Sequence, residues 1–209
     1  MLLLALLIIL AGYLVGSFPS GYLAARIAGR DIRKEGSGNI GATNVLRVLG
    51  KRYGYPVFFL DTFKGFMAAR VTLFAVSRMP VARDYAELYA CLAATACIIG
   101  HSFPIWLKFK GGKGVATSAG AFLGLVPLAA IPAFIIWIVV FETTRYVSVA
   151  SVIASISVPV MIAILVRMKM TQGAVFLYFA SALALLVVWR HRANFSRLLK
   201  GTEQRFDRK

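Results

Sequence analysis

The chain has 209 residues, of which 59% are hydrophobic, and its mean hydropathy of +0.76 is far above that of a soluble domain of this size. Its formal net charge is nevertheless +16, from 24 lysines and arginines against 8 acidic residues. Because the cations gather in loops and at the C-terminus, away from the long apolar runs, the composition indicates an integral membrane protein. It argues against a nucleic-acid-binding protein, which would need a soluble fold to carry a basic face.

Six apolar runs are long enough to be membrane helices, since about 20 residues cross the hydrocarbon core. The first run has no basic segment before it and continues past the length of a signal peptide, so we expect a retained helix. The fourth run is long and is interrupted by Pro127 and Pro132. It predicts either one kinked helix or two short ones. In chain order the runs cover roughly 2–26, 54–77, 85–105, 114–141, 147–167 and 172–190.

The two alternatives for the fourth run predict different topologies. Two crossings through 114–141 place the polar loops and the basic C-terminus on one side of the membrane, whereas a single crossing would separate them. Since positively charged loops face the cytoplasm, we predict an all-α polytopic protein with about seven transmembrane helices, N-terminus out and C-terminus in. We expect one transmembrane domain over residues 1–192 and a short basic cytoplasmic tail over residues 193–209.

A glycine-lysine loop at residues 109–117, Phe-Lys-Gly-Gly-Lys-Gly-Val-Ala-Thr, has the features of an anion-binding site. Its glycines let backbone amides approach a ligand, its lysines add charge, and the helix that follows offers amides at its N-terminus. It is not a Walker A loop, because Leu107 occupies the position of the first glycine. The alternative is a flexible, positively charged loop. The candidate ligand contacts are Lys110, Gly111, Gly112, Lys113, Gly114 and Thr117.

The segment 37–44, Ser-Gly-Asn-Ile-Gly-Ala-Thr-Asn, carries four hydrogen-bonding side chains in eight residues. Such a segment forms an anion nest or caps the helix that follows, but capping alone would use one polar side chain. Arg47 follows Asn44 by three residues, which places both on the same helix face. We expect ligand contact here, with capping as the alternative. The residues concerned are Ser37, Asn39, Gly41, Thr43, Asn44 and Arg47.

Two pairs of opposite charges stand three residues apart. Asp61 and Lys64 lie inside the second apolar run, where charges are costly and face either a functional site or each other. Glu142 and Arg145 precede the run 147–167, where a local salt bridge would contribute little. The alternative is that Arg145 or Ser148 completes a polar surface between the loops.

Each of the two histidines, His101 and His191, lies at the predicted cytoplasmic end of a span, where it could handle a proton. Arg190 and Arg192 flank His191 and favour its neutral, base-competent form. We expect His191 to act in the chemistry, and His101 either to act or to orient the turn that follows it. The sequence has no GxSxG elbow, HxxxxD arrangement or metal-ligand cluster. An enzyme with this sequence would therefore work by positioning and electrostatics, without a covalent intermediate.

Together the motifs strongly resemble the bacterial acyl-phosphate-dependent glycerol-3-phosphate acyltransferases, the PlsY family, over nearly the whole chain. The motifs that carry the resemblance, in order, are 37–44, Leu60-Asp61 with Lys64-Gly65, 100–104 leading into 109–117, 145–148, and His191-Arg192-x-Asn194.

The resemblance implies a seven-helix enzyme of the bacterial inner membrane with its active site on the cytoplasmic face. Such an enzyme transfers a fatty acyl group from acyl phosphate to the sn-1 hydroxyl of glycerol-3-phosphate, giving 1-acyl-glycerol-3-phosphate (lysophosphatidic acid) and phosphate in phospholipid biosynthesis. It implies these two substrates and membrane lipid as partners, no cofactor, no metal and no nucleic acid, with a monomer as the simplest arrangement.

By motif position, the resemblance also implies roles for individual residues. Ser37, Arg47, Lys113, His191 and Asn194 are expected to contact glycerol-3-phosphate or phosphate, and the glycines of Gly111–Gly114 to hold the acyl phosphate. The catalytic candidates are His191, Lys113 and Ser37. The substrate-binding candidates are Asn39, Gly41, Thr43, Asn44, Arg47, Lys64, His101, Lys110, Gly111, Gly112, Gly114, Thr117, Arg145, Ser148 and Asn194.

The proton of the attacking hydroxyl needs an acceptor, for which His191 and a substrate phosphate oxygen are the two candidates. We favour a contribution from the phosphate, because dedicated bases are scarce. A transporter of phosphate or of an organic phosphate is the alternative function. It would need access from both faces of the membrane, whereas the polar loops are predicted to lie on one.

Overall fold

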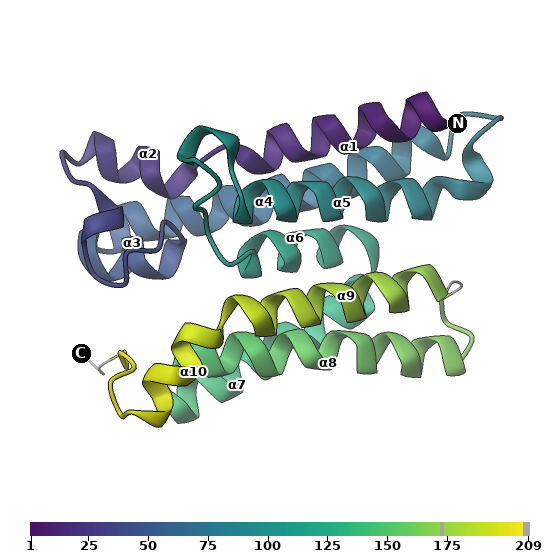
Figure 1. The fold of residues 1–209 in the computed structure, drawn as a ribbon. Helices are drawn as coiled ribbons and strands as arrows, with labels where there is room; N and C mark the ends of the chain where they lie inside the picture. The colour runs from purple at the N-terminus through teal and green to yellow at the C-terminus, as the bar shows by residue number, and fades with distance from the viewer. Residues whose placement is uncertain (172–173, 207–209) are drawn as a thin grey trace. The chain divides into compact units, whose positions relative to one another are not determined.

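The structure, a computed structural model, describes residues 1–171 and 174–206. Every regular element in these residues is helical, which confirms the all-α prediction (Figure 1). The chain divides into two compact units, residues 1–125 and residues 126–209, each with its own helix packing.

In the first unit, α5 packs against α1 and α4, and α4 also packs against α3 and α6 (Figure 1). Because α4 and α5 run in opposite directions, the start of α4 and the end of α5 lie at the same end of the unit. The loops that carry the glycine motifs are attached at that end. In chain order the elements are α1 (Leu2–Ser17), α2 (Ser20–Ile27), the 3₁₀ turn η1 (Ile32–Lys34), α3 (Ala42–Leu49), α4 (Lys51–Val76), η2 (Arg83–Tyr85), α5 (Ala86–Ser102), η3 (Ile105–Leu107) and α6 (Val115–Leu125).

Glycines bring these helices into close contact. A Cβ atom on Gly16 of α1 would overlap the carbonyl oxygen of Cys97 in α5. A Cβ atom on Gly120 of α6 would likewise overlap the carbonyl oxygen of Thr62 in α4. Small residues at helix contacts are typical of packing in membranes, where close backbone approach gives the dispersion contacts that hold helices together.

In the second unit, α8 packs against α7 and α9, and α9 bends into α10 by 48° (Figure 1). The chain end folds back onto the turn between α7 and α8, where the Phe206 N–H donates to the Arg145 carbonyl oxygen at 3.0 Å. The Phe206 ring meets Phe141 edge-on, with 5.7 Å between centroids. The tail as far as Phe206 is therefore part of the fold of this unit. The elements are α7 (Pro127–Thr144), α8 (Val147–Arg167), α9 (Ala174–Arg190) and α10 (Arg192–Leu199).

The predicted runs match the helices of the described residues with two informative differences, and residues 172 and 173 of the last run lie outside the described residues. The run 114–141 is two helices, broken at Val126 just before a proline, as the second of our alternatives predicted. The run 2–26 is also two helices, and the prediction of a single one was wrong. Pro19 lacks an N–H donor and holds Phe18 in an extended conformation with ψ of 115°, which ends α1.

Among the residues that the structure describes, four helical segments are long and apolar enough to cross a membrane, and the bent pair of α9 and α10 would make a fifth. The shorter apolar helix α6 has 11 residues, or about 17 Å of helix, and does not reach across a 30 Å core by itself. The four candidate spans are Leu2–Ile27, Arg83–Leu107, Pro127–Thr144 and Val147–Arg167.

Candidate active site

The segment 37–44 is organised by Asn44, whose side chain is buried at the start of α3. Asn44 Oδ1 accepts the Ser37 N–H at 2.9 Å, and Asn44 Nδ2 donates to the carbonyl oxygens of Asn39 at 2.9 Å and Glu35 at 3.0 Å. Asn39 Oδ1 in turn accepts the Gly41 N–H at 2.8 Å. The side chains of these two asparagines bond to backbone groups of residues 35–41 and so hold the loop in a folded shape. The N-cap residue of α3, Gly41, supplies no side-chain cap. Ser37 lies exposed on the outside of the loop.

The glycine-lysine loop doubles back onto the end of α5. Its approach is strained, because Lys108 and Phe109 both adopt left-handed φ values, 51° and 61°, that cost free energy for non-glycine residues. The Gly111 N–H donates to the Ser102 carbonyl oxygen and the Gly112 N–H to that of His101, both at 3.1 Å. These two amides therefore hold the loop in place. An anion here would instead meet the first-turn amides of α6, which no carbonyl of that helix can reach.

The two glycine-containing loops meet each other. Asn39 Nδ2 donates to the Gly111 carbonyl oxygen across a long bond of 3.5 Å. Lys110 is exposed, while Lys113 and Arg47 are half-buried at the same end of the unit. The first unit thus brings together cationic and glycine-rich motifs whose contacting residues, Asn39 and Gly111, are 72 positions apart in the sequence.

Beneath the loop lies a buried ionic cluster. Lys64 Nζ is 2.9 Å from Asp61 Oδ1, and the two side chains are only 8% and 2% exposed, which confirms the ion-pair alternative. His101 Nδ1 lies 3.4 Å from the same oxygen, and Ser20 Oγ–H donates to it at 2.6 Å. Lys64 also donates to the Phe18 carbonyl oxygen at 3.1 Å. Lys64 and His101, which we expected to contact substrate, are both buried and both contact the Asp61 carboxylate instead.

Thr117 is a second expected ligand contact that the structure places inside the protein. It is fully buried, and its carbonyl oxygen lies against Gly65 of α4. Thr117 is therefore part of the close contact between α4 and α6. Thr43 is half-buried on α3, and Gly114 adopts a left-handed φ of 80° at the start of α6, a conformation that suits glycine.

In the second unit, polar residues converge on the carboxylate of Glu203. The carboxylate accepts bonds from Asn194 Nδ2 at 2.5 Å, Arg197 Nε at 2.8 Å and Ser148 Oγ at 2.9 Å, and the side chain is 5% exposed. Burial by itself would raise the pKa of Glu203. The hydrogen bonds from Asn194, Ser148 and Arg197 outweigh burial and hold the pKa below its usual value.

His191 is buried at the bend between α9 and α10. Its Nδ1 lies 2.8 Å from the Val187 carbonyl oxygen. A carbonyl only accepts, so Nδ1 carries the hydrogen and Nε2 is the basic nitrogen of the neutral ring. The geometry is therefore that of an oriented base.

Arg145 lies at the turn between α7 and α8 with a left-handed φ of 63°. Its guanidinium is 2.6 Å from Glu142 and lies over the Phe141 ring at 5.7 Å. The local salt bridge that we gave as one alternative is confirmed.

Sequence reasoning missed two members of these clusters. Glu203 is an acidic residue in the basic tail, and the sequence analysis considered only the positive charge of that tail. An acidic residue that interrupts a basic segment is the signal that could have identified it. Ser20 follows a proline in an apolar run, and nothing in its sequence context predicts its contact with Asp61. Within residues 1–171 and 174–206, no group of three or more His, Cys, Asp or Glu side chains could hold a metal ion.

Comparison with known proteins decides the family. Residues 6–201 match the family described as glycerol-3-phosphate acyltransferase. The chain belongs to this family. Glycerol-3-phosphate acyltransferases of Desulforamulus reducens and Prochlorococcus marinus (strain NATL2A) are 43% and 46% identical to it, with 97% and 96% of this chain and 96% and 97% of those proteins covered.

Solved structures agree. The chain is similar to crystal structures of PlsY, an integral membrane glycerol 3-phosphate acyltransferase, in its glycerol 3-phosphate form and its lysophosphatidic acid form. The TM-scores are 0.85 and 0.82 and the identities 40% and 39%; both cover 97% of this chain, and 96% and 95% of the PlsY chains. This acyltransferase is thus an all-helical, multi-pass integral membrane protein with four or five candidate spans.

Proposed function

We propose that this glycerol-3-phosphate acyltransferase uses a fatty acyl phosphate as its donor and acylates the sn-1 hydroxyl of glycerol-3-phosphate. The products are lysophosphatidic acid and inorganic phosphate. The observation that carries the proposal is the junction of two glycine-containing loops in the first unit, joined between Asn39 and Gly111 and accompanied by fixed cations. Two phosphate-bearing substrates need two such anion sites.

The cations and the start of α6 suit the phosphate groups. Arg47 and Lys113 are half-buried, which strengthens their attraction for an anion relative to fully solvated side chains. Ser37, Arg47 and Lys113 of the first unit suit contact with glycerol-3-phosphate or phosphate. We give the same role to His191 and Asn194 of the second unit. We assign the glycines of Gly111–Gly114 and the first turn of α6 to the acyl phosphate.

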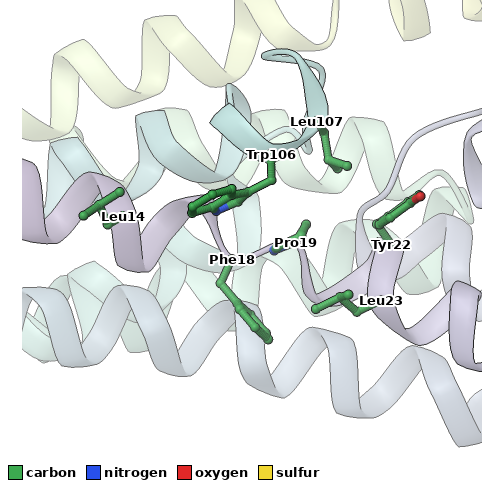
Figure 2. Close-up of a pocket in the computed structure, with 7 residues that line it drawn as sticks. All are labelled: Leu14, Phe18, Pro19, Tyr22, Leu23, Trp106 and Leu107. Carbon is green, nitrogen blue, oxygen red and sulfur yellow. The ribbon is translucent and has the colours of Figure 1, made fainter.

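An apolar pocket beside the glycine-lysine loop suits the acyl chain. It has a volume of about 410 Å³ and lies where the break between α1 and α2 faces η3 (Figure 2). Figure 2 shows Trp106 above Phe18 and Pro19, with Leu107 nearer to Tyr22. The Lys110 N–H donates to the Leu107 carbonyl oxygen at 3.1 Å, so the loop begins at the edge of the pocket. Replacement of Leu14, which lines the pocket, by tryptophan should shift the preference toward shorter acyl chains.

The reaction needs no cofactor, because a mixed anhydride is already activated. The sn-1 hydroxyl oxygen attacks the acyl carbonyl carbon, the bond from that carbon to the phosphate oxygen breaks, and phosphate leaves. The hydroxyl proton goes to a phosphate oxygen or to His191 Nε2. A His191→Gln variant that loses less than about tenfold in kcat would support the phosphate; a loss above about 10⁴ would support His191.

We propose seven crossings, with the N-terminus outside and the polar loops on the cytoplasmic face of the bacterial inner membrane. The break at Val126 supports this topology, because it makes α6 and α7 separate helices. The excess of lysine and arginine in the loops supports the orientation.

The test is a reconstitution with purified protein in detergent. With glycerol-3-phosphate and palmitoyl phosphate, the proposal predicts equal amounts of lysophosphatidic acid and phosphate, and no product when palmitoyl-CoA replaces palmitoyl phosphate. Product from palmitoyl-CoA alone would refute the donor assignment. Transport of phosphate across proteoliposomes without acylation would favour the rival transporter.

A further inference from the structure

The buried cluster of Asp61, Lys64 and His101 has no place in the reaction described so far. The three residues are 1%, 8% and 6% exposed, and Lys64 and His101 both contact the Asp61 carboxylate. Charges inside membrane helices are costly and are kept where they serve a purpose. Their position directly beneath the glycine-lysine loop indicates what that purpose is.

Residues of α2, α4 and the α1–α2 connection hold the Asp61 carboxylate in place. Asp61 Oδ1 is held by Lys64 Nζ at 2.9 Å and by Ser20 Oγ at 2.6 Å, and Lys64 is itself tied to the Phe18 carbonyl oxygen. These contacts fix the carboxylate relative to α1, α2 and α4. His101 Nδ1, 3.4 Å away, is the group of the cluster that belongs to α5.

The opposite edge of the imidazole supports the loop. A Cβ atom on Gly112 would overlap His101 Nε2, so the backbone of Gly112 rests directly against the ring. The amides of Gly111 and Gly112 bond to the carbonyl oxygens of Ser102 and His101 on either side of that contact. The ring therefore sets the distance between the loop and α5. Only glycine fits at position 112, because a Cβ atom there would overlap the ring.

We propose that Asp61 and His101 are positioning residues. In this arrangement Asp61 orients the imidazole, the imidazole sets the position of Gly112, and the loop then presents Lys113 and the start of α6 to a substrate phosphate. The inference rests on the proposed function of the loop as a phosphate site. Misplacement of a binding group by about 1 Å can cost about 100-fold in rate, so a small shift of this contact should be measurable.

The variant of choice is His101→Asn. The asparagine Nδ2 takes the place of Nδ1 and keeps the bond to Asp61, so the buried ion pair stays satisfied, while the part of the ring that touches Gly112 is removed. Gly112→Ala tests the contact from the other side. Thr62→Val is the matched control, since Thr62 is the neighbour of Asp61 and bonds only to its own helix at Phe58.

Each variant is purified, its unfolding temperature is measured, and KM is determined separately for glycerol-3-phosphate and palmitoyl phosphate. We expect His101→Asn to unfold near the wild-type temperature but to raise KM for one of the two substrates by about tenfold or more, which identifies the phosphate that the loop holds. Gly112→Ala should raise the same KM. In the double variant Gly112→Ala should raise KM by less than about a further twofold, because the imidazole atoms that the alanine Cβ would overlap have been removed.

Wild-type KM values in His101→Asn, or effects of the two substitutions that multiply in the double variant, would overturn the inference. So would a lower unfolding temperature with both KM values unchanged, since that is the result of a structural role alone. If the wild-type protein does not use palmitoyl phosphate, the proposed donor is wrong; the positioning role is then tested by glycerol-3-phosphate binding to the same variants.

Discussion

The carboxylate of Glu203 is the strongest candidate for a single group that stabilises the second unit. It accepts three hydrogen bonds from Ser148, Asn194 and Arg197, and its side chain is 5% exposed. Glu203→Gln keeps the shape and one acceptor oxygen but loses the charge, and we expect a cost of about 1–2 kcal/mol. Glu203→Ala leaves the donors without an acceptor and should cost about 3 kcal/mol.

For a chain of this length, 1 kcal/mol lowers the unfolding temperature by about 2–4 °C. The expected decreases are therefore about 2–8 °C for Glu203→Gln and about 6–12 °C for Glu203→Ala. They can be measured by thermal unfolding of the purified protein in detergent. The matched control is Asp84→Asn, because the Asp84 side chain is 85% exposed and its loss should change stability by less than about 0.5 kcal/mol.

The pH dependence provides a separate test. Because the pKa of Glu203 is lowered in the folded protein, its contribution is fully present above the ordinary glutamate pKa of about 4.5 and is lost as the pH falls through the lower, folded value. The difference in unfolding temperature between wild type and Glu203→Gln should therefore be constant near neutral pH and become smaller below about pH 4.5. A Gln variant that unfolds with the wild type at pH 7, or a gap that widens in acid, would refute the reasoning.

Three further outcomes follow from the contacts. Asn44→Ala removes the side chain that folds the loop 37–44, and kcat/KM should fall about 100-fold with the protein still folded; a wild-type value would contradict the role of that loop. Gly65→Val would drive a side chain into the Thr117 carbonyl and should abolish folded protein, as size-exclusion chromatography in detergent would show. Gly29 has open space around it and a φ of 75°, so Gly29→Ala should lower the free energy of unfolding by only about 1–2 kcal/mol. If Gly29→Ala and Gly65→Val lost the same amount of folded protein, the overlap between helices would not explain the effect of Gly65→Val.

Local composition was enough to predict the helices wherever polar residues bound an apolar run. The run 147–167 coincides with α8 because Arg145 and Arg167 mark its ends. The break at Pro19 was missed because the run stays apolar through it, and the hydrophobic pattern outweighed a single proline. Helix α10 was missed because it is only eight residues long and Arg192, Asn194, Ser196 and Arg197 alternate with its apolar residues.

The residue types of the site could be predicted, but their arrangement could not. Glycines beside lysines indicated an anion loop, yet the bonds that use the Gly111 and Gly112 amides depend on the path of the chain after α5. The contact between Asp61 and His101 joins residues 40 positions apart, and no local pattern encodes it.

The central claim is that the glycine-lysine loop and the basic C-terminal segment both face the cytoplasm, as the distribution of lysine and arginine along the chain predicts. Single cysteines at Lys110 and Lys200, both exposed, test it after the buried Cys91 and Cys97 are replaced by alanine. Val81, in the connection at the other end of α4 and α5, is the reference position. A membrane-impermeant maleimide should label positions 110 and 200 in inside-out vesicles and position 81 in right-side-out vesicles. Labelling of positions 110 and 200 from opposite faces would contradict the account.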